Sequence, residues 1–295
     1  MIEALTLHRP VQFRRRDEML QHGWTTRALT AAVGAGALIR PRRGVYLPGE
    51  VSSDIVDACR HGGRLACVSA LVPYGIFVLD SSSLHVHLAP NAARLRTMSR
   101  PVRRHWGRLR REPHPSSTSV EVFDALLQAV RCQPPRAAVA TLDSALYRGA
   151  LSPDDLDELF RALPRRYRVI RRLLDPRSES GPETLVRLIL RSLGAHVEVQ
   201  VRIRGVGRVD FVVDGWLIIE CDSEAHHASW EAQRRDRRRD QAAAQQGFAT
   251  YRPIAEDIMW HADDVRAAIG GLLGSHRRAT SRSQENQRHR GPQSA

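Results

Sequence analysis

The sequence predicts a multidomain α+β protein with an N-terminal winged helix-turn-helix, a mixed and mainly helical middle, and a C-terminal α/β core. Two apolar runs meet at Asp214-Gly215, a dipeptide typical of a β-hairpin. Helical and alternating patterns succeed one another along the chain and separate its regions. With 295 residues and 42% apolar side chains, the chain is long enough for two or three cores. We expect domains over residues 1–50, 51–175 and 176–274, followed by a disordered tail over 275–295.

The charge balance favours an anionic partner. The formal net charge is +13. The sequence contains no Lys, so all 45 residues counted as Lys or Arg are Arg. Excess positive charge attracts nucleic acid or anionic surfaces, and the guanidinium binds phosphate in a bidentate manner. A compositional preference for Arg explains why the basic residues are Arg and not Lys. It does not explain why basic residues outnumber acidic ones. Because no apolar run is long enough to span a bilayer and the N-terminus lacks a signal peptide, we expect a cytoplasmic protein without a membrane partner.

The first region has the outline of a winged helix-turn-helix. A short helix is predicted over residues 14–22, and Thr25 or Thr26 can cap a second helix. Two short strands around Pro41 and Gly44 then form a basic hairpin. In such a fold the second helix enters the major groove of duplex DNA and the hairpin, or wing, contacts phosphates.

The wing supplies the first candidate nucleic-acid-binding residues. Arg40, Arg42 and Arg43 lie on it and are expected to contact the DNA backbone. A protein-interaction module with the same fold is the alternative, and the pattern identifies no residue that reads a base.

The middle region predicts mainly amphipathic helices and one alternating segment, L-H-V-H-L, which is typical of a strand. His85 and His87 would share one face of it as a metal pair, although no third ligand is nearby, so ordinary exposed histidines are the alternative. The basic run over residues 94–111 predicts a solvated surface that touches DNA. The cysteines have no spacing typical of a metal site and indicate a reduced protein: Cys59, Cys67, Cys132 and Cys221.

The last region predicts the order helix, three strands, helix, strand, helix. Its first helix begins at Ser180, where Glu183 three residues later completes a capping box. An alternating strand precedes the Asp214-Gly215 hairpin, and a polar helix over residues 230–246 follows it. A further strand and a helix over residues 255–273 complete the region.

The hairpin pattern predicts that Asp210 and Glu220 are cross-strand neighbours. A loop with an odd number of residues, such as Asp214-Gly215-Trp216, keeps one face purely apolar and places both carboxylates, followed by Asp222, on the other face. Facing carboxylates repel unless a cation lies between them, and their oxygens suit a hard ion such as Mg²⁺. A pair of solvated acids on an exposed sheet face is the alternative.

Several spaced motifs accompany this pair. In chain order they are Ser180-Gly181-Pro182-Glu183, Gln200, Gly207-Arg208-Val209-Asp210-Phe211, Glu220-Cys221-Asp222, His227, Asp236-Arg237-Arg238-Arg239-Asp240, and Gly247-Phe248 with Arg252. Over about residues 178–270 this pattern resembles the PD-(D/E)XK nuclease core of restriction-endonuclease-like proteins. It resembles more narrowly the uncharacterised proteins related to very-short-patch-repair (Vsr) endonucleases. The front of the chain, ending in R-R-G-V-Y, resembles the winged-helix region of AbiEi-family antitoxins.

The resemblance implies an endonuclease that depends on Mg²⁺ or Mn²⁺. In it, Asp210 and Glu220 would hold the metal, and Glu183 would complete the shell directly or through water. Asp222 stands where the wider superfamily has its Lys, which is absent from this chain. For Glu183, a role as the capping-box residue alone is the alternative.

The resemblance also implies roles for residues after the hairpin. His227 is the candidate for general acid and base catalysis, because its ordinary pKa is near neutral. Arg237 and Arg252 would clamp phosphate or the transition-state charge, and Arg239 is a further candidate contact to nucleic acid. Surface roles are the alternatives for His227 and for the ion pair of Asp236 with Arg237.

Two classes of function therefore remain open. The leading one is a Mg²⁺-dependent endonuclease acting on duplex DNA. The other is a DNA-binding regulator, similar to an antitoxin, that keeps a nuclease-like domain for binding or dimerisation. An RNA-directed nuclease is a third alternative, since a metal-bound carboxylate pair does not distinguish ribose from deoxyribose. The oligomeric state stays open, with a homodimer as one option.

Overall fold

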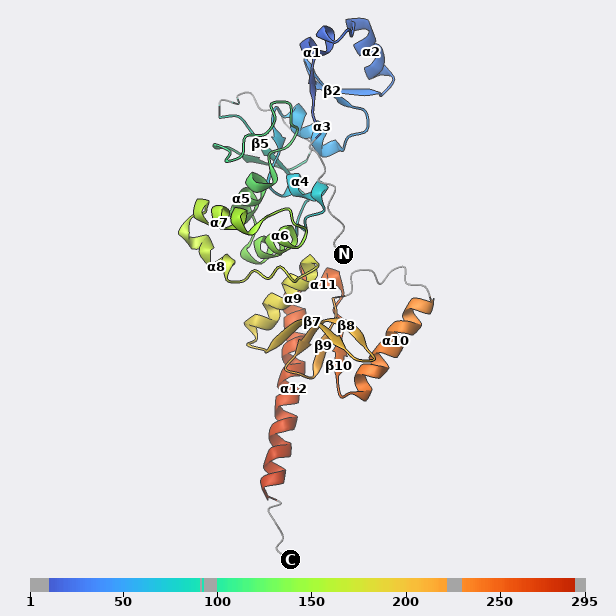
Figure 1. The fold of residues 1–295 in the computed structure, drawn as a ribbon, viewed down its shortest axis with the longest axis vertical. Helices are drawn as coiled ribbons and strands as arrows, with labels where there is room; N and C mark the ends of the chain where they lie inside the picture. The colour runs from blue at the N-terminus through green and yellow to red at the C-terminus, as the bar shows by residue number, and fades with distance from the viewer. Residues whose placement is uncertain (1–10, 91, 93–99, 222–229, 290–295) are drawn as a thin grey trace, which may run out of the picture. The chain divides into compact units, whose positions relative to one another are not determined.

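The computed structural model describes residues 11–90, 92, 100–221 and 230–289 (Figure 1). The described elements form an α+β fold with three small sheets. The chain divides into two compact units, Met1–Gly181 (unit 1) and Pro182–Ala295 (unit 2). The predicted boundary after residue 175 lies near this division, whereas the predicted regions 1–50 and 51–175 belong together in unit 1. In the described part of the chain, no helix is both long and apolar enough to cross a membrane.

Unit 1 begins with the predicted helix, helix and hairpin, which are α1 (Arg16–Gln21), α2 (Thr26–Gly34), β2 (Leu38–Arg42) and β3 (Val45–Pro48). The predicted helix over residues 14–22 is shorter than expected, because β1 (Arg14–Arg15) pairs with β3 instead. The resulting sheet has the order β1-β3-β2.

Local interactions explain this part of the fold. Thr25 caps α2, since its Oγ1 accepts a hydrogen bond of 3.1 Å from the backbone N–H of Ala28. A small core of Met19, Leu29 and Tyr46 holds the two helices against the hairpin. Of the wing arginines, Arg40 and Arg43 are left exposed.

The rest of unit 1 combines a second sheet with a group of helices. The sheet has the order β4-β5-β6, and β5 runs parallel to β6. The predicted strand L-H-V-H-L is β5, but its histidines are buried and not exposed. The elements are α3 (Ser53–Arg60), β4 (Arg64–Leu65), α4 (Cys67–Leu71), η1 (Val72–Tyr74), β5 (Leu84–His87), β6 (Val102–His105), α5 (Val122–Cys132), α6 (Pro135–Tyr147), α7 (Pro153–Ala162), η2 (Arg165–Tyr167) and α8 (Arg168–Arg171).

The basic run predicted over residues 94–111 is only partly described, because residues 94–99 lie outside the described part. Within the remainder, Val102–His105 forms β6 and pairs with β5 along its whole length. This stretch is therefore part of a sheet, in which Val102 and His105 are half-buried and Arg103 and Arg104 are exposed.

Unit 2 has the predicted order of elements. They are α9 (Gly181–Ser192), β7 (Val197–Ile203), β8 (Gly207–Val213), β9 (Leu217–Ile219), α10 (Trp230–Gln245), β10 (Ala249–Tyr251), α11 (Ala255–Trp260) and α12 (Ala262–His289). The sheet has the order β10-β9-β8-β7, in which β10 is parallel to β9 and the other neighbours are antiparallel. In Figure 1, α10 lies on one side of this sheet, and α9 and α12 lie on the other.

The C-terminal end departs from the prediction. The expected helix over residues 255–273 is divided at His261 into α11 and α12, and α12 continues to His289 through the tail that we predicted to be disordered. Two contacts hold α12 beyond Leu273. His276 stacks on Trp216 with ring centroids 4.1 Å apart, and Arg277 lies 3.4 Å from Asp214. These contacts join residues that are distant in the sequence, so the composition of the tail alone could not predict them.

The central hairpin has the predicted odd loop. Val213 pairs with Leu217, and the backbone turns through Asp214 and Gly215, whose φ angles are +48° and +75°. The alternative of an exposed second face does not hold for its apolar residues. Val212 and Ile218 on it are 5% and 1% exposed and pack with Ala243 of α10. The predicted carboxylates therefore lie at the end of a face that α10 covers.

Candidate functional site

The sheet of unit 2 places three of the motif residues in one row. Phe211 pairs with Ile219, so the next positions along these antiparallel strands, Asp210 and Glu220, lie opposite each other as predicted. On the other side of β8, the pairs Val199 with Phe211 and Val201 with Val209 bracket Gln200 opposite Asp210.

Helix α9 adds a fourth residue to this row. Glu183 is 7% exposed, and its Oε2 accepts a hydrogen bond of 2.9 Å from Nε2 of Gln200. We call Glu183, Gln200, Asp210 and Glu220 the carboxylate row. Gln200 has a φ of +54°, a conformation that costs about 1–2 kcal/mol in a residue other than Gly. Such strain persists where surrounding interactions impose it, often at functional sites.

The carboxylates converge on Cys221, which directly follows Glu220. The Cys221 backbone N–H donates a hydrogen bond of 2.8 Å to Asp210 Oδ2. Burial raises the pKa of the Cys221 thiol well above its ordinary range, and the negative charges of Asp210, Glu183 and Glu220 raise it further. This environment favours the protonated form of the thiol.

Two guanidinium groups hold the Glu220 carboxylate. Arg239 Nη2 lies 3.0 Å from its Oε1, and Arg252 Nη1 lies 3.1 Å from its Oε2. Arg252 also donates a hydrogen bond of 2.8 Å to Asp240. Burial raises the pKa of Glu220 above its ordinary value, against the opposing charges of Arg252 and Arg239. The site is therefore a partly desolvated group of alternating charges.

Two buried polar atoms in this group have no hydrogen-bond partner among the described residues. They are Oε1 of Gln200, an acceptor, and Nε of Arg252, a donor. A buried polar atom without a partner is costly and is usually satisfied by water, an ion or a ligand. Both atoms are shielded from solvent, so each carries the cost of a buried polar group.

The predicted site residues are only partly assembled by the described structure. Glu183, Asp210, Glu220 and Arg252 come together, whereas Arg237 lies on the exposed side of α10. Asp222 and His227 lie outside the described residues. Arg239 is committed to Glu220 and donates further hydrogen bonds to the backbone carbonyls of Val206 and Arg208, at 2.9 and 2.8 Å.

The wing residues line a hollow in the first part of unit 1. Arg40 and Arg43 are exposed, and Arg42 is half-buried. Arg15 and Arg16, from β1 and α1, line the same hollow. The surface is thus strongly cationic between the wing and the start of α1, although the sequence indicated only the wing.

A second group of potential metal ligands was missed by the sequence interpretation. The donor atoms of Cys67, His85, His105 and Cys132 in unit 1 all lie within 4.8 Å of one another. In the part of the chain that the structure describes, no other set of three or more such donors is so close, and the carboxylate row is more open. The predicted pairing of His85 with His87 is corrected, since the Nδ1 of His87 lies 3.3 Å from Gln128 Nε2 and only His85 joins the group.

Comparisons with known proteins do not identify the chain. No family model matches it, and no curated protein matches it. Its function is therefore argued from the geometry of these sites.

Proposed function

We propose that unit 2 is a Mg²⁺-dependent endonuclease of the PD-(D/E)XK type that acts on duplex DNA in the cytoplasm. The observation that carries this proposal is the carboxylate row, in which the charges of Glu183, Asp210 and Glu220 converge at Cys221 and Arg252 lies beside Glu220. A cation would balance the carboxylates, and a guanidinium beside them suits a phosphate. The Vsr-like motif order supports the same proposal.

The donor set fits a hard divalent cation. Asp210 and Glu220 would bind it, and Glu183 would complete its shell directly or through water. Mg²⁺ keeps several waters and uses one or two carboxylates, so the open spacing of the row suits it better than a closed cage. When bound, such a cation lowers the pKa of a coordinated water and neutralises phosphate charge.

The chain's own residues would position the reacting groups. The Cys221 N–H fixes the Asp210 carboxylate, and Gln200 orients Glu183. Arg252, held by Asp240 and Glu220, would place its guanidinium beside a phosphate bound at the row. His227 is the proposed general acid or base, and Asp222 occupies the position of the usual Lys.

Unit 1 would provide binding that does not depend on the metal. Its cationic hollow, lined by Arg15, Arg16, Arg40, Arg42 and Arg43, suits the DNA backbone. This binding would raise the local concentration of duplex around the nuclease.

Cleavage of supercoiled plasmid by the purified full-length protein tests the proposal. We expect nicking with Mg²⁺ or Mn²⁺ and none with EDTA, and a loss of more than about 100-fold in Asp210→Asn and Glu220→Gln. Glu198→Gln is the matched control, because Glu198 is an exposed carboxylate on the neighbouring strand β7. Cleavage that persists in Asp210→Asn, or in EDTA, contradicts the proposal.

The contacts of Glu220 favour a second candidate, a DNA-binding regulator without catalysis. Both oxygens of this carboxylate already have guanidinium partners, so its charge is balanced without a metal. A regulator would bind one preferred sequence, ignore Mg²⁺ and retain binding in Glu220→Gln. Plasmid cleavage measured with and without Mg²⁺ distinguishes the two candidates, because the nuclease cleaves only with the metal and the regulator cleaves under neither condition.

A further inference from the structure

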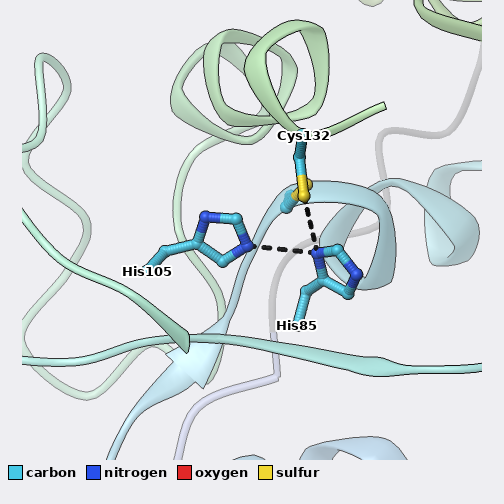
Figure 2. A group of neighbouring side chains, drawn as sticks. His85, His105 and Cys132 are labelled. Carbon is cyan, nitrogen blue, oxygen red and sulfur yellow. Dashed lines mark hydrogen bonds between the residues drawn. The ribbon is translucent and has the colours of Figure 1, made fainter. Parts of the chain in front are cut away.

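Four soft donor side chains meet inside unit 1. Cys67 is the first residue of α4, His85 lies on β5, His105 ends β6 and Cys132 ends α5. We call these residues the Cys/His cluster. Figure 2 shows the His85 and His105 rings directed toward each other from neighbouring strands, with the Cys132 thiol approaching the same point from α5.

The distances match the edges of a tetrahedral metal site. His85 Nδ1 lies 3.1 Å from His105 Nε2, and Cys132 Sγ lies 3.9 Å from His85 Nδ1. Tetrahedral Zn²⁺, with bonds of about 2.0–2.1 Å to nitrogen and 2.3 Å to sulfur, separates two nitrogens by about 3.3 Å and a sulfur from a nitrogen by about 3.6 Å. These two distances differ from the tetrahedral values by about 0.2 and 0.3 Å, and the other donor pairs lie within 4.8 Å.

The surroundings hold the donors in place. The Cys67 backbone N–H donates a hydrogen bond of 3.0 Å to Gln128 Oε1, and the His85 N–H donates one of 2.9 Å to Ser69 Oγ. Cys67 is 0% exposed and has a φ of +49°, and His85 is 7% exposed. His105 and Cys132 are half-buried, and the strained backbone at Cys67 is imposed by the packing around it.

The donor types select the metal. Two thiols and two imidazoles favour Zn²⁺ over Mg²⁺ or Ca²⁺, which prefer oxygen ligands. Four protein donors also leave no open coordination position, as is typical of structural and not catalytic zinc. On binding, the two thiols release their protons and the imidazoles bind in the neutral form.

We propose that Cys67, His85, His105 and Cys132 bind one structural Zn²⁺ that joins the sheet of unit 1 to α4 and α5. The ion would connect elements that are far apart in the sequence and would stabilise the platform that carries the wing. This site is independent of the carboxylate row and of any activity of unit 2. A disulfide between Cys67 and Cys132 is the competing outcome, because their sulfur atoms lie within 4.8 Å of each other.

Metal analysis of untagged full-length protein, purified under reducing conditions without a chelator, tests the proposal. We expect about one zinc per chain. We expect zinc content to fall at least tenfold in Cys132→Ala and to stay unchanged in Cys59→Ala. Cys59 is the matched control, because it is another buried free cysteine of unit 1 and lies outside the cluster. Zinc retained in Cys132→Ala overturns the proposal.

Cobalt substitution uses the unaltered protein, so this test remains informative if Cys132→Ala fails to fold. Exchange of zinc for Co²⁺ should produce the thiolate-to-metal charge-transfer band of a tetrahedral site. A reduced wild-type protein that gives no such band and binds no zinc overturns the proposal. A Cys67–Cys132 disulfide in the freshly isolated protein, detected by mass spectrometry in the absence of zinc, overturns it as well.

Discussion

The carboxylate row of unit 2 and the Cys/His cluster of unit 1 are opposite kinds of site. The row presents oxygen donors and arginines, is only partly buried and has atoms that lack partners. The cluster presents sulfur and nitrogen donors that lie within 4.8 Å of one another. An open oxygen site suits an exchangeable ion that meets substrate, whereas a closed sulfur and nitrogen site suits an ion that stays.

The loss of each site is expected to have a different consequence for the protein. The row lies beside a sheet whose register is already set by backbone pairing and by the apolar core under α10. The cluster joins two strands to the ends of two helices, and its four donors come from four different elements. We therefore expect changes at the row to affect metal binding and changes at the cluster to affect folding.

The largest expected effect is at the cluster. Cys132→Ala should lower the free energy of unfolding by more than about 4 kcal/mol in zinc-loaded protein, because a structural metal is lost. Cys59→Ala should cost only about 1 kcal/mol, as for an ordinary buried side chain. Chemical denaturation measures both variants. Equal losses would show that Cys132 acts by packing alone.

A second prediction concerns Gln200 in the row. Gln200→Gly should weaken Mn²⁺ binding by about 10–100-fold, the usual effect of removing a group that orients metal ligands. Stability should change by less than about 1 kcal/mol, because relief of the left-handed backbone offsets the lost hydrogen bond to Glu183. Calorimetric titration with Mn²⁺ and denaturation of the same variant separate the two effects. Unaltered Mn²⁺ affinity would remove Gln200 from the site.

A third prediction compares Arg239 with Arg237 on α10. Arg239→Ala should cost about 1–3 kcal/mol, because it removes the hydrogen bonds to the carbonyls of Val206 and Arg208 and one of the two guanidinium partners of the Glu220 carboxylate. Arg237→Ala, on the exposed side of the same helix, should change stability by less than about 0.5 kcal/mol. Thermal denaturation compares the two. Equal costs would contradict the contacts described for Arg239.

The smallest expected effect is a pH dependence of the stability of unit 1. Burial, with the positive charge of Arg104, lowers the pKa of His61 below its ordinary value of 6.5. The unfolded chain therefore takes up a proton near that pH before the folded chain does. The stabilising contribution is present above 6.5 and is lost as the pH falls through the folded pKa.

His61→Gln should remove this part of the acid sensitivity. The difference amounts to less than about 1.4 kcal/mol per pH unit, the limit for one proton. Denaturation at several pH values between neutrality and mild acid measures it. His22→Gln, at an exposed histidine, is the control. Acid sensitivity that persists unchanged in His61→Gln would contradict the assignment.

Much of the fold was predictable because it depends on local patterns. The cap at Thr25 and the Asp214-Gly215 turn each follow from neighbouring residues, and the order of elements in unit 2 follows from their periodicity. The continuation of α12 was not predictable. It accompanies contacts of His276 and Arg277 with Trp216 and Asp214, which are distant in the sequence.

The two sites also differ in whether the sequence could predict them. Asp210 and Glu220 were predictable, because one short hairpin brings them together whenever its apolar face is buried. The Cys/His cluster was not, because its donors come from four elements and His85 meets His105 only through the parallel pairing of β5 with β6. On α10, the motif indicated Arg237, whereas the helical phase directs Arg239 toward Glu220.

The central claim is that the two units hold two different metals independently. Calorimetric titration of zinc-loaded full-length protein with Mn²⁺, in parallel with metal analysis, tests this claim most directly. We predict one Mn²⁺ site in the wild type that is lost in Asp210→Asn, while the zinc content stays the same in both proteins. Mn²⁺ binding that survives in Asp210→Asn, or Mn²⁺ that displaces zinc, would contradict the account.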